Sequence, residues 1–161
     1  MLTKEEILHA LNEIPDPEIP VISIVELGVI REIKLNESAV EVIITPTYSG
    51  CPAMKQMETD VHKKLVEKGF KEIKITTVFN PAWTTDWMSA EAKKKLQDYG
   101  IAPPEESTSD KSFLSNKPKM ITCPRCKSKN TVMVSQFGST ACKALYKCNE
   151  CLEAFDYFKC I

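Results

Sequence analysis

Four cysteines near the end of the chain are spaced like the ligands of a metal ion. Cys123 and Cys126 form one C-x2-C pair, Cys148 and Cys151 form a second, and 21 residues lie between the pairs. Two such turns, here called knuckles, bring four thiolates together in the tetrahedron that structural zinc prefers. Thiolate-only sites also suit iron, so an iron–sulfur or rubredoxin-like iron centre is the alternative. The spacing therefore predicts a metal site with zinc as the expected ion.

Cys142 and Cys160 lie in the same cysteine-rich segment but outside the knuckle spacing. Two interpretations stay open for them: small buried hydrophobic residues, or a second thiol pair that takes part in metal transfer. Lysines and an arginine make this segment basic, but few aromatic residues alternate with them. We therefore expect a solvated or protein-binding face there, and no nucleic-acid site.

The remaining cysteine, Cys51, follows Gly50 and precedes Pro52, a residue that suits the first turn of a helix. This order places Cys51 at a predicted helix N-cap, where unpaired backbone N–H groups and the helix dipole favour a thiolate. A depressed pKa and partial exposure would make it a reactive or metal-ligating thiol. One cysteine does not define a site, so a residue that merely fills a turn is the competing interpretation.

Two carboxylates, Asp16 and Glu18, project from an Asp-Pro-Glu-Ile-Pro segment that its prolines hold extended. They would steer a cation or polarise the region of Cys51, or they would belong to a solvated turn that ends a helix. His9 and His62 fall on predicted helices without a partner at ligand spacing. We assign both histidines to the surface or to the edge of the core.

Both tryptophans, Trp83 and Trp87, lie in one proline-containing loop. Two large rings in a loop either pack over a sheet or form a binding surface for a partner. We predict a partner surface at this loop and keep packing over the sheet as the alternative.

Hydrophobic patterns indicate the elements that position these residues. Thr3 and Glu6 form a capping box at the start of a short amphipathic helix that ends before Pro15. With this helix as its first element, the chain has the order α-β-β-α-β-α. This order predicts an α+β domain with a small mixed sheet, whose second and third strands run parallel. After the first helix, the predicted elements are strands 28–35 and 39–45, a helix 52–69, a strand 71–79 and a helix 89–99.

The cysteine-rich segment is predicted to form a zinc ribbon. Its expected strands are 131–137, 144–147 and 154–159, with Gly138 at the turn of the hairpin. About 40 residues bury too little surface to fold unaided, so metal is expected to hold this module together. Lys127 and Leu152 stand after the knuckles where glycine is usual. We predict a first domain at 1–101, a Pro- and Ser-rich linker at 102–119 and the ribbon at 120–161.

The whole-chain composition bounds the function. Of 161 residues, 43% are hydrophobic and 27% charged, with a formal net charge of −1. These values are typical of a globular protein and give no general attraction to nucleic acid or to anionic membranes. No apolar run approaches the roughly 20 residues that span a bilayer, and the N-terminus lacks a signal-peptide pattern. We expect a soluble cytoplasmic protein, and the sequence leaves a homodimer open.

The motifs resemble a known family. The segments 16–20 and 45–52, with the strand–helix order, resemble the metal–sulfur cluster assembly family, to which the bacterial SufT proteins and the eukaryotic cytosolic iron–sulfur targeting factors belong. Further motifs resemble its PaaD (PaaJ) branch, the accessory subunits of the bacterial phenylacetyl-CoA epoxidase system. These motifs lie at residues 45–52, 81–87, 100–104, 123–126 and 137–143.

The resemblance implies an accessory role in aerobic phenylacetate degradation, in which the protein matures iron–sulfur clusters or iron in the oxygenase and reductase subunits. It implies structural zinc in the ribbon and a functional thiol at Cys51 that holds iron or a cluster transiently, with Asp16, Glu18 and Thr47 in support. The chain has neither a di-iron Glu-x-x-His helix pair nor a dinucleotide-binding loop, so we expect no catalytic residues. The alternatives are a structural subunit that docks on the oxygenase, and an enzyme with Cys51 as nucleophile, which no suitably placed histidine supports.

Overall fold

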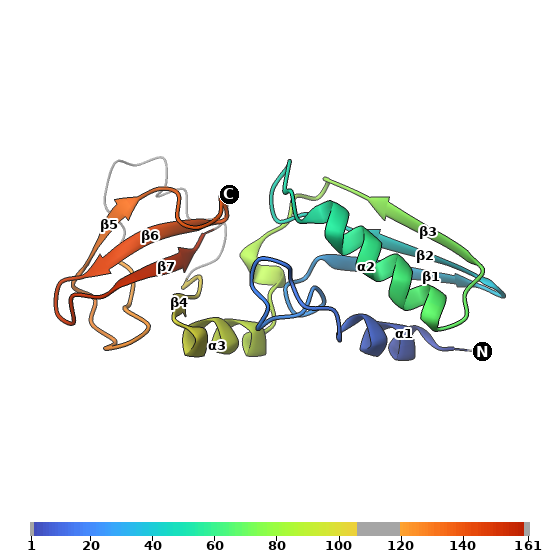
Figure 1. The fold of residues 1–161 in the computed structure, drawn as a ribbon, viewed down its shortest axis with the longest axis horizontal. Helices are drawn as coiled ribbons and strands as arrows, with labels where there is room; N and C mark the ends of the chain where they lie inside the picture. The colour runs from blue at the N-terminus through green and yellow to red at the C-terminus, as the bar shows by residue number, and fades with distance from the viewer. Residues whose placement is uncertain (1, 106–119, 160–161) are drawn as a thin grey trace. The chain divides into compact units, whose positions relative to one another are not determined.

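A computed structural model describes residues 2–105 and 120–159. Contacts group the chain into two compact units, which meet in sequence between Trp83 and Thr84 (Figure 1). Within the described residues, no helix is both long and apolar enough to cross a bilayer.

The N-terminal unit has the predicted α+β architecture around a three-stranded mixed sheet. The central strand β2 is antiparallel to β1 and parallel to β3, and α2 lies across one face of the sheet (Figure 1). The parallel pairing follows from the helical crossover between β2 and β3. The elements of this unit are α1 (Lys4–Leu11), β1 (Ile30–Asn36), β2 (Ala39–Ile44), α2 (Met54–Glu67) and β3 (Glu72–Thr77).

Periodicity explains which side chains form the core of this unit. Every second residue of β2 is buried, and the buried residues of α2 recur every four positions. These spacings put one row of each element on the same side, so that strand and helix bury one apolar face each. Burial of each such side chain contributes about 1.5–3 kcal/mol. The rows are Val40, Val42 and Ile44 in β2 and Met57, Val61 and Leu65 in α2.

The C-terminal unit contains the ribbon. The hairpin β5–β6 and the strand β7 form the antiparallel arrangement that the sequence predicts. An additional strand, β4, pairs in parallel with β7 and gives the sheet order β4-β7-β6-β5. The elements of this unit are the 3-10 helix η1 (Thr85–Trp87), α3 (Ala90–Tyr99), β4 (Ile101–Ala102), β5 (Thr131–Ser135), β6 (Lys143–Cys148) and β7 (Ala154–Phe158).

Two features of this unit bear on the predicted boundaries. Helix α3, which we predicted within the first domain, groups by its contacts with the ribbon. Ala102, which we placed at the start of the linker, lies in β4, and the linker residues 106–119 lie outside the described residues. A strand of two residues carries no periodicity, so the sequence pattern gave no sign of β4.

Candidate metal centre and thiol site

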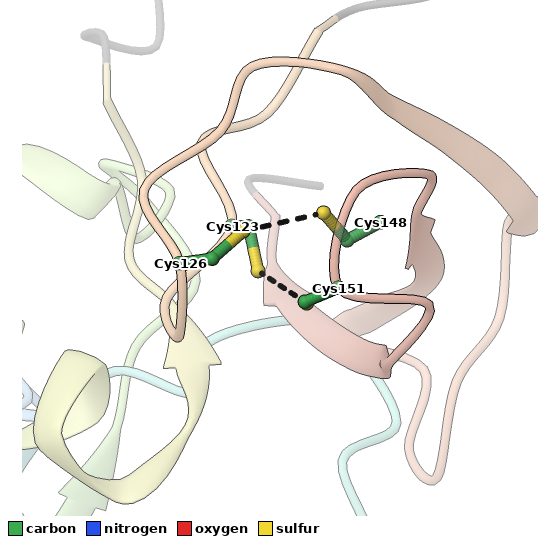
Figure 2. Close-up of side chains that lie close together, drawn as sticks. All are labelled: Cys123, Cys126, Cys148 and Cys151. Atoms are coloured by element: carbon green, nitrogen blue, oxygen red, sulfur yellow. Dashed lines mark hydrogen bonds between the residues drawn. The ribbon is translucent and has the colours of Figure 1, made fainter.

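The four knuckle cysteines converge at one end of the ribbon sheet. Their sulfur atoms all lie within 4.8 Å of one another. Two contacts join the knuckles: 3.5 Å between the sulfurs of Cys126 and Cys148, and 3.8 Å between those of Cys123 and Cys151 (Figure 2). A tetrahedron with metal–sulfur bonds of about 2.3 Å separates its sulfurs by roughly 3.8 Å. The four thiols therefore fit one tetrahedral metal ion.

The two knuckles have the same backbone geometry. The backbone N–H of the first cysteine donates to the carbonyl five residues later, from Cys123 to Ser128 at 2.8 Å and from Cys148 to Glu153 at 2.9 Å. This repeated bond closes each turn so that its two sulfurs point to the same side. The second C-x2-C pair thus repeats the local structure of the first.

The residue after each knuckle adopts a left-handed backbone conformation. Lys127 has φ 64° and Leu152 has φ 63°, and among the described residues these are the non-glycine residues with positive φ. Both positions are those where the sequence lacks the expected glycine. The turn therefore forms with a side chain in a region that L-residues adopt at a cost of about 1–2 kcal/mol.

The clustering of the thiols changes their pKa values when no metal is bound. The backbone N–H of Cys151 is the main cause that lowers the pKa of Cys148 to about 7. At Cys151, a hydrogen bond from the Glu153 backbone lowers the pKa, but burial and the neighbouring thiols outweigh it and raise the pKa to about 12. Thiols this close do not ionise together without a cation, which is the behaviour of a metal site.

Cys51 is not at a helix N-cap, so that prediction was wrong. Helix α2 begins at Met54 and its N-cap is Ala53, whose side chain makes no capping bond. Pro52 and Ala53 form a turn instead, in which the Met54 N–H donates to the Cys51 carbonyl at 3.2 Å. The thiol is 8% exposed, which is less than the partial exposure that we expected.

The surroundings of Cys51 disfavour its thiolate, contrary to our expectation of a depressed pKa. Burial is the main cause that raises the pKa of the Cys51 thiol. Hydrogen bonds from the Ala53 backbone and the Tyr48 side chain act in the opposite direction. The carboxylates of Glu18 and Asp16 raise the pKa further, because a negative charge nearby opposes a second one. The structure thus brings the Asp-Pro-Glu segment into the electrostatic reach of Cys51.

Asp16 organises the loop that places Glu18 in this site. Its side chain is 4% exposed, and Oδ1 accepts hydrogen bonds from the backbone N–H groups of Glu18 at 2.8 Å and Ile19 at 2.7 Å. The Asp16 N–H itself donates to the Ile22 carbonyl at 2.8 Å. Asp16 therefore belongs to a buried turn and not to a solvated one, and Glu18 is half-buried beside it.

The loop between β2 and Cys51 holds another polar feature. Thr47 is half-buried in this loop. The hydroxyl of its neighbour Thr45 is buried, and no partner for it exists among the described residues. An unpaired buried hydroxyl costs free energy and is uncommon outside functional sites. Within the described residues, the groups that could hold a metal ion by themselves are the four knuckle cysteines, and Cys51 with the two carboxylates is not among them.

The other predicted site residues fall in several environments. Trp83 is 4% exposed and its indole N–H donates to the Leu27 carbonyl at 3.0 Å, so its ring packs inside the N-terminal unit. Trp87 is half-buried in η1, and the prediction of a partner surface rests on it. His9 and His62 are exposed.

The two remaining cysteines and one further residue complete the site. Cys142 is 4% exposed, and Cys160 lies outside the described residues, so their pairing stays a prediction. The sequence analysis missed Tyr48 as a hydrogen-bond partner of Cys51. Its position three residues before the cysteine was the available signal, because a turn brings residues at that spacing together.

Comparisons with known proteins agree with this two-part organisation. Residues 4–78 match a family model described as iron–sulfur cluster assembly protein, and residues 107–159 match one described as PaaD zinc beta ribbon domain. The chain is 45% identical to the D subunit of the putative 1,2-phenylacetyl-CoA epoxidase of Escherichia coli K12, over 97% of this chain and 92% of that protein.

Two further relatives match the N-terminal part. An Fe–S protein maturation auxiliary factor of Porphyromonas gingivalis is 38% identical, over 58% of this chain and 90% of the relative. The crystal structure of a domain of unknown function (DUF59) from Bacillus anthracis superposes with a TM-score of 0.55 at 31% identity, over 58% of this chain and 90% of that one. The ribbon at the C-terminal end therefore extends a domain that occurs alone in other proteins. By its identity over nearly its whole length, and by its pair of matching domains, the chain belongs to the PaaD family of phenylacetyl-CoA epoxidase components.

Proposed function

We propose that this protein is an accessory factor of a phenylacetyl-CoA epoxidase system and matures the iron–sulfur cluster or iron of its partner subunits. The observation that carries the proposal is the joining, in one chain, of a domain like the Fe–S maturation factors to the PaaD zinc ribbon. The 45% identity to the Escherichia coli protein extends the proposal to the epoxidase system. The partners are its oxygenase and reductase subunits.

The chemistry of the two units supports separate roles. Four thiols in closed knuckles suit a resident structural zinc ion, which would hold the ribbon folded. Cys51 offers one soft donor on the other unit, and the negative charges of Glu18 and Asp16 lie within electrostatic reach of it. We assign to Cys51 the transient contact with iron or a cluster, supported by Asp16, Glu18 and Thr47. No step of the epoxidation itself is assigned to this chain, so it acts as a factor and not as an enzyme.

The raised pKa of Cys51 fits a ligand that forms only when cargo arrives. At neutral pH the thiol stays protonated, because burial and the nearby carboxylates disfavour a thiolate. An iron cation reverses this balance, since it is attracted by the carboxylates and displaces the thiol proton. The thiol is therefore unreactive at rest and becomes a ligand in the presence of the metal.

Anaerobic co-expression with the oxygenase and reductase subunits tests this function. Without this protein, or with Cys51→Ala, we expect the partners to accumulate with less iron and sulfide, and phenylacetate-dependent growth to stop. Cys126→Ala serves as a matched cysteine control, because it should disturb the ribbon metal and leave Cys51 intact. Partner subunits that carry full iron and sulfide with Cys51→Ala would contradict the role of this thiol.

One observation favours a second candidate, a non-catalytic subunit that docks on the oxygenase. Cys51 is 8% exposed, which limits direct contact with a metal in a partner. In vitro assays with fully loaded partner subunits separate the two functions. A maturation factor is dispensable for epoxidation once the partners are loaded, whereas a docking component is required at every turnover.

A further inference from the structure

The end of α3 and the first knuckle form the two walls of a cleft that the proposed function does not use. Its volume is about 390 Å³, which is within the range of ligand sites in proteins. The α3 wall consists of residues 97–100, and the knuckle wall of Pro124, Arg125 and Lys127. Both walls belong to the C-terminal unit. We call this feature the knuckle cleft.

The ribbon itself holds the two walls in place. Gly100 ends α3 in a left-handed conformation, and β4 follows at once and pairs with β7. Ala102 of β4 and Cys123 of the first knuckle lie in the same apolar core. Within the knuckle, the Lys127 N–H donates to the Cys123 carbonyl at 3.0 Å. A cleft with fixed walls loses little conformational entropy when a ligand binds.

The knuckle wall is basic. The side chains of Arg125 and Lys127 are both exposed. The Nζ of Lys127 donates to the Pro124 carbonyl at 2.9 Å, which fixes its ammonium group on this wall. Among residues 2–105 and 120–159, no ion pair joins either cation to a carboxylate. The described part of the chain therefore supplies no counter-charge to the two cations.

Backbone strain at Lys127 is a second sign that this wall has a use. The φ of 64° is one that glycine adopts without a Cβ conflict, so a side chain here is unfavourable for the turn. Strained residues of this kind cluster at functional sites, where the side chain is worth more than the strain. Because Lys127 is exposed, it adds charge to the wall rather than buried surface.

The α3 wall has the opposite electrostatic character. Asp98 lies on it, and the last turn of α3 contains no basic residue. The end of a helix also presents carbonyl groups that carry a partial negative charge and lack partners within the helix. The ring of Tyr99 is 57% exposed beside them. A ligand that fits this cleft brings anionic groups to the knuckle wall and hydrogen-bond donors to the α3 wall.

A peptide with acidic side chains meets both requirements. Its carboxylates pair with the guanidinium and ammonium groups, and its backbone N–H groups donate to the carbonyls of the helix end. Tyrosine and arginine are also the side chains that often dominate binding energy at protein interfaces. A nucleic acid would bring phosphates against both walls, and the negative α3 wall opposes that.

We propose that the knuckle cleft binds an acidic segment of a partner protein, with Arg125 as the main contact of its carboxylates. Arg125 has this place because the ammonium group of Lys127 already donates to Pro124. The proposal goes beyond the maturation function and does not involve Cys51.

Proton–nitrogen NMR of the zinc-loaded full chain tests the proposal, with the capped peptide acetyl-Gly-Glu-Leu-Glu-Gly-amide as the probe. We expect chemical-shift changes at residues 97–100 and 124–127. The same peptide with glutamine in place of glutamate should bind roughly tenfold more weakly, because it lacks the charged acceptors. Changes confined to other residues, equal binding of the two peptides, or tighter binding of a single-stranded oligonucleotide would overturn the proposal.

Variants of single charges locate the contact. Arg125→Gln should weaken binding of the acidic peptide about three- to tenfold. Lys129→Gln is the matched control, because it removes an exposed ribbon cation that does not line the cleft, and it should leave the affinity unchanged. Asp98→Asn should strengthen binding about two- to threefold, since it removes a repulsive charge. Unchanged affinity in Arg125→Gln would refute the role of this side chain.

Zinc analysis of each variant separates docking from support of the metal centre. A zinc ion held by four thiolates carries a net negative charge, which nearby cations offset. For Arg125→Gln we expect full zinc content together with the weaker binding. Loss of zinc together with loss of binding would show that Arg125 serves the metal centre, and the docking role would be wrong. Since no step of this test involves Cys51, that result would leave the proposed function standing.

Discussion

Burial, hydrogen bonds and nearby charges act together on the cysteine sulfurs of this protein. At Cys51, burial together with the carboxylates of Glu18 and Asp16 raises the pKa, against hydrogen bonds from Ala53 and Tyr48. Proximity to a helix start does not lower this pKa, because Pro52 and Ala53 separate the thiol from the first turn of α2. Beyond burial and the Ala53 backbone, the carboxylate of Glu18 and the hydroxyl of Tyr48 are two side chains with opposite effects on the pKa of Cys51.

Glu18→Gln and Tyr48→Phe should move the reactivity of Cys51 in opposite directions. Removal of the Glu18 charge lowers the pKa of Cys51, so alkylation at pH 7 should become roughly three- to tenfold faster. Removal of the Tyr48 hydroxyl raises that pKa and should slow alkylation by a similar factor. The measurement is the iodoacetamide rate at Cys51 between pH 6 and 10, read by mass spectrometry.

Glu13→Gln is a matched control for the loss of a carboxylate, because Glu13 pairs with Lys64 at 2.8 Å and not with Cys51. This variant should leave the Cys51 rate unchanged. Equal effects of Glu18→Gln and Glu13→Gln would mean that net charge, and not proximity to the thiol, sets the reactivity.

At the scale of elements, the two knuckles form despite unfavourable backbone conformations. Lys127 and Leu152 take left-handed φ values. Each lies in a knuckle turn that is closed by the hydrogen bond from the first cysteine N–H to the carbonyl five residues later, and this turn requires a left-handed residue. A metal ion bound by the four thiolates would offset this strain, since it would tie both turns to one centre. Leu152 is 69% exposed, so its side chain buries little surface in return.

Leu152→Gly should stabilise the metal-loaded ribbon by about 0.5–1 kcal/mol, because glycine adopts a positive φ without the Cβ conflict. Such a gain corresponds to a rise of about 2–8 °C in the melting temperature of a unit of this size. Calorimetry of the zinc-loaded protein measures it. Leu152→Ala keeps a Cβ and should give no gain, so an equal rise in both variants would show that loss of the exposed leucine is the cause.

Much of the element order and the clustering of the four knuckle cysteines could be predicted from the sequence, because they depend on local spacing. The C-x2-C pairs, the alternation in β2 and the four-residue period in α2 each reflect one element by itself. Strand β4 and the ion pair between Lys143 and Asp156 depend on contacts between segments far apart in the chain, and no local pattern marks them. The N-cap of α2 is Ala53, two residues after the predicted position at Cys51, so Cys51 lies in the turn before the helix.

The whole molecule consists of two units that should respond differently to loss of metal. The N-terminal unit has its own apolar core, whereas the ribbon core is small and adjoins the metal ligands Cys123 and Cys148. Cys123→Ser combined with Cys148→Ser should release about one zinc ion per chain, as measured by metal analysis. Hydrogen exchange should then accelerate in residues 120–159 and remain slow in residues 1–83.

Cys142→Ser is the control for this experiment, because it removes a ribbon thiol that is not a knuckle ligand. The zinc content should be unchanged in that variant. Full zinc content in the double variant would contradict the four-thiolate site, and loss of protection in both units would show that they unfold as one.

Strand β4 ties the end of the first described part of the chain to the ribbon sheet in the second. Strand β4 precedes residues 106–119, strands β5, β6 and β7 follow them, and all four strands belong to one sheet. The Thr122 N–H donates to the Glu105 carboxylate at 2.9 Å. The adjoining ends of the two described parts of the chain are therefore held together, through Glu105 and Thr122, within one unit. Doubling the length of a loop whose ends are held together costs about 0.6 kcal/mol of closure entropy. We therefore expect a fluorescent or affinity sequence inserted between Glu105 and Met120 to leave the ribbon folded, because the described residues on both sides of the insertion stay tied to each other.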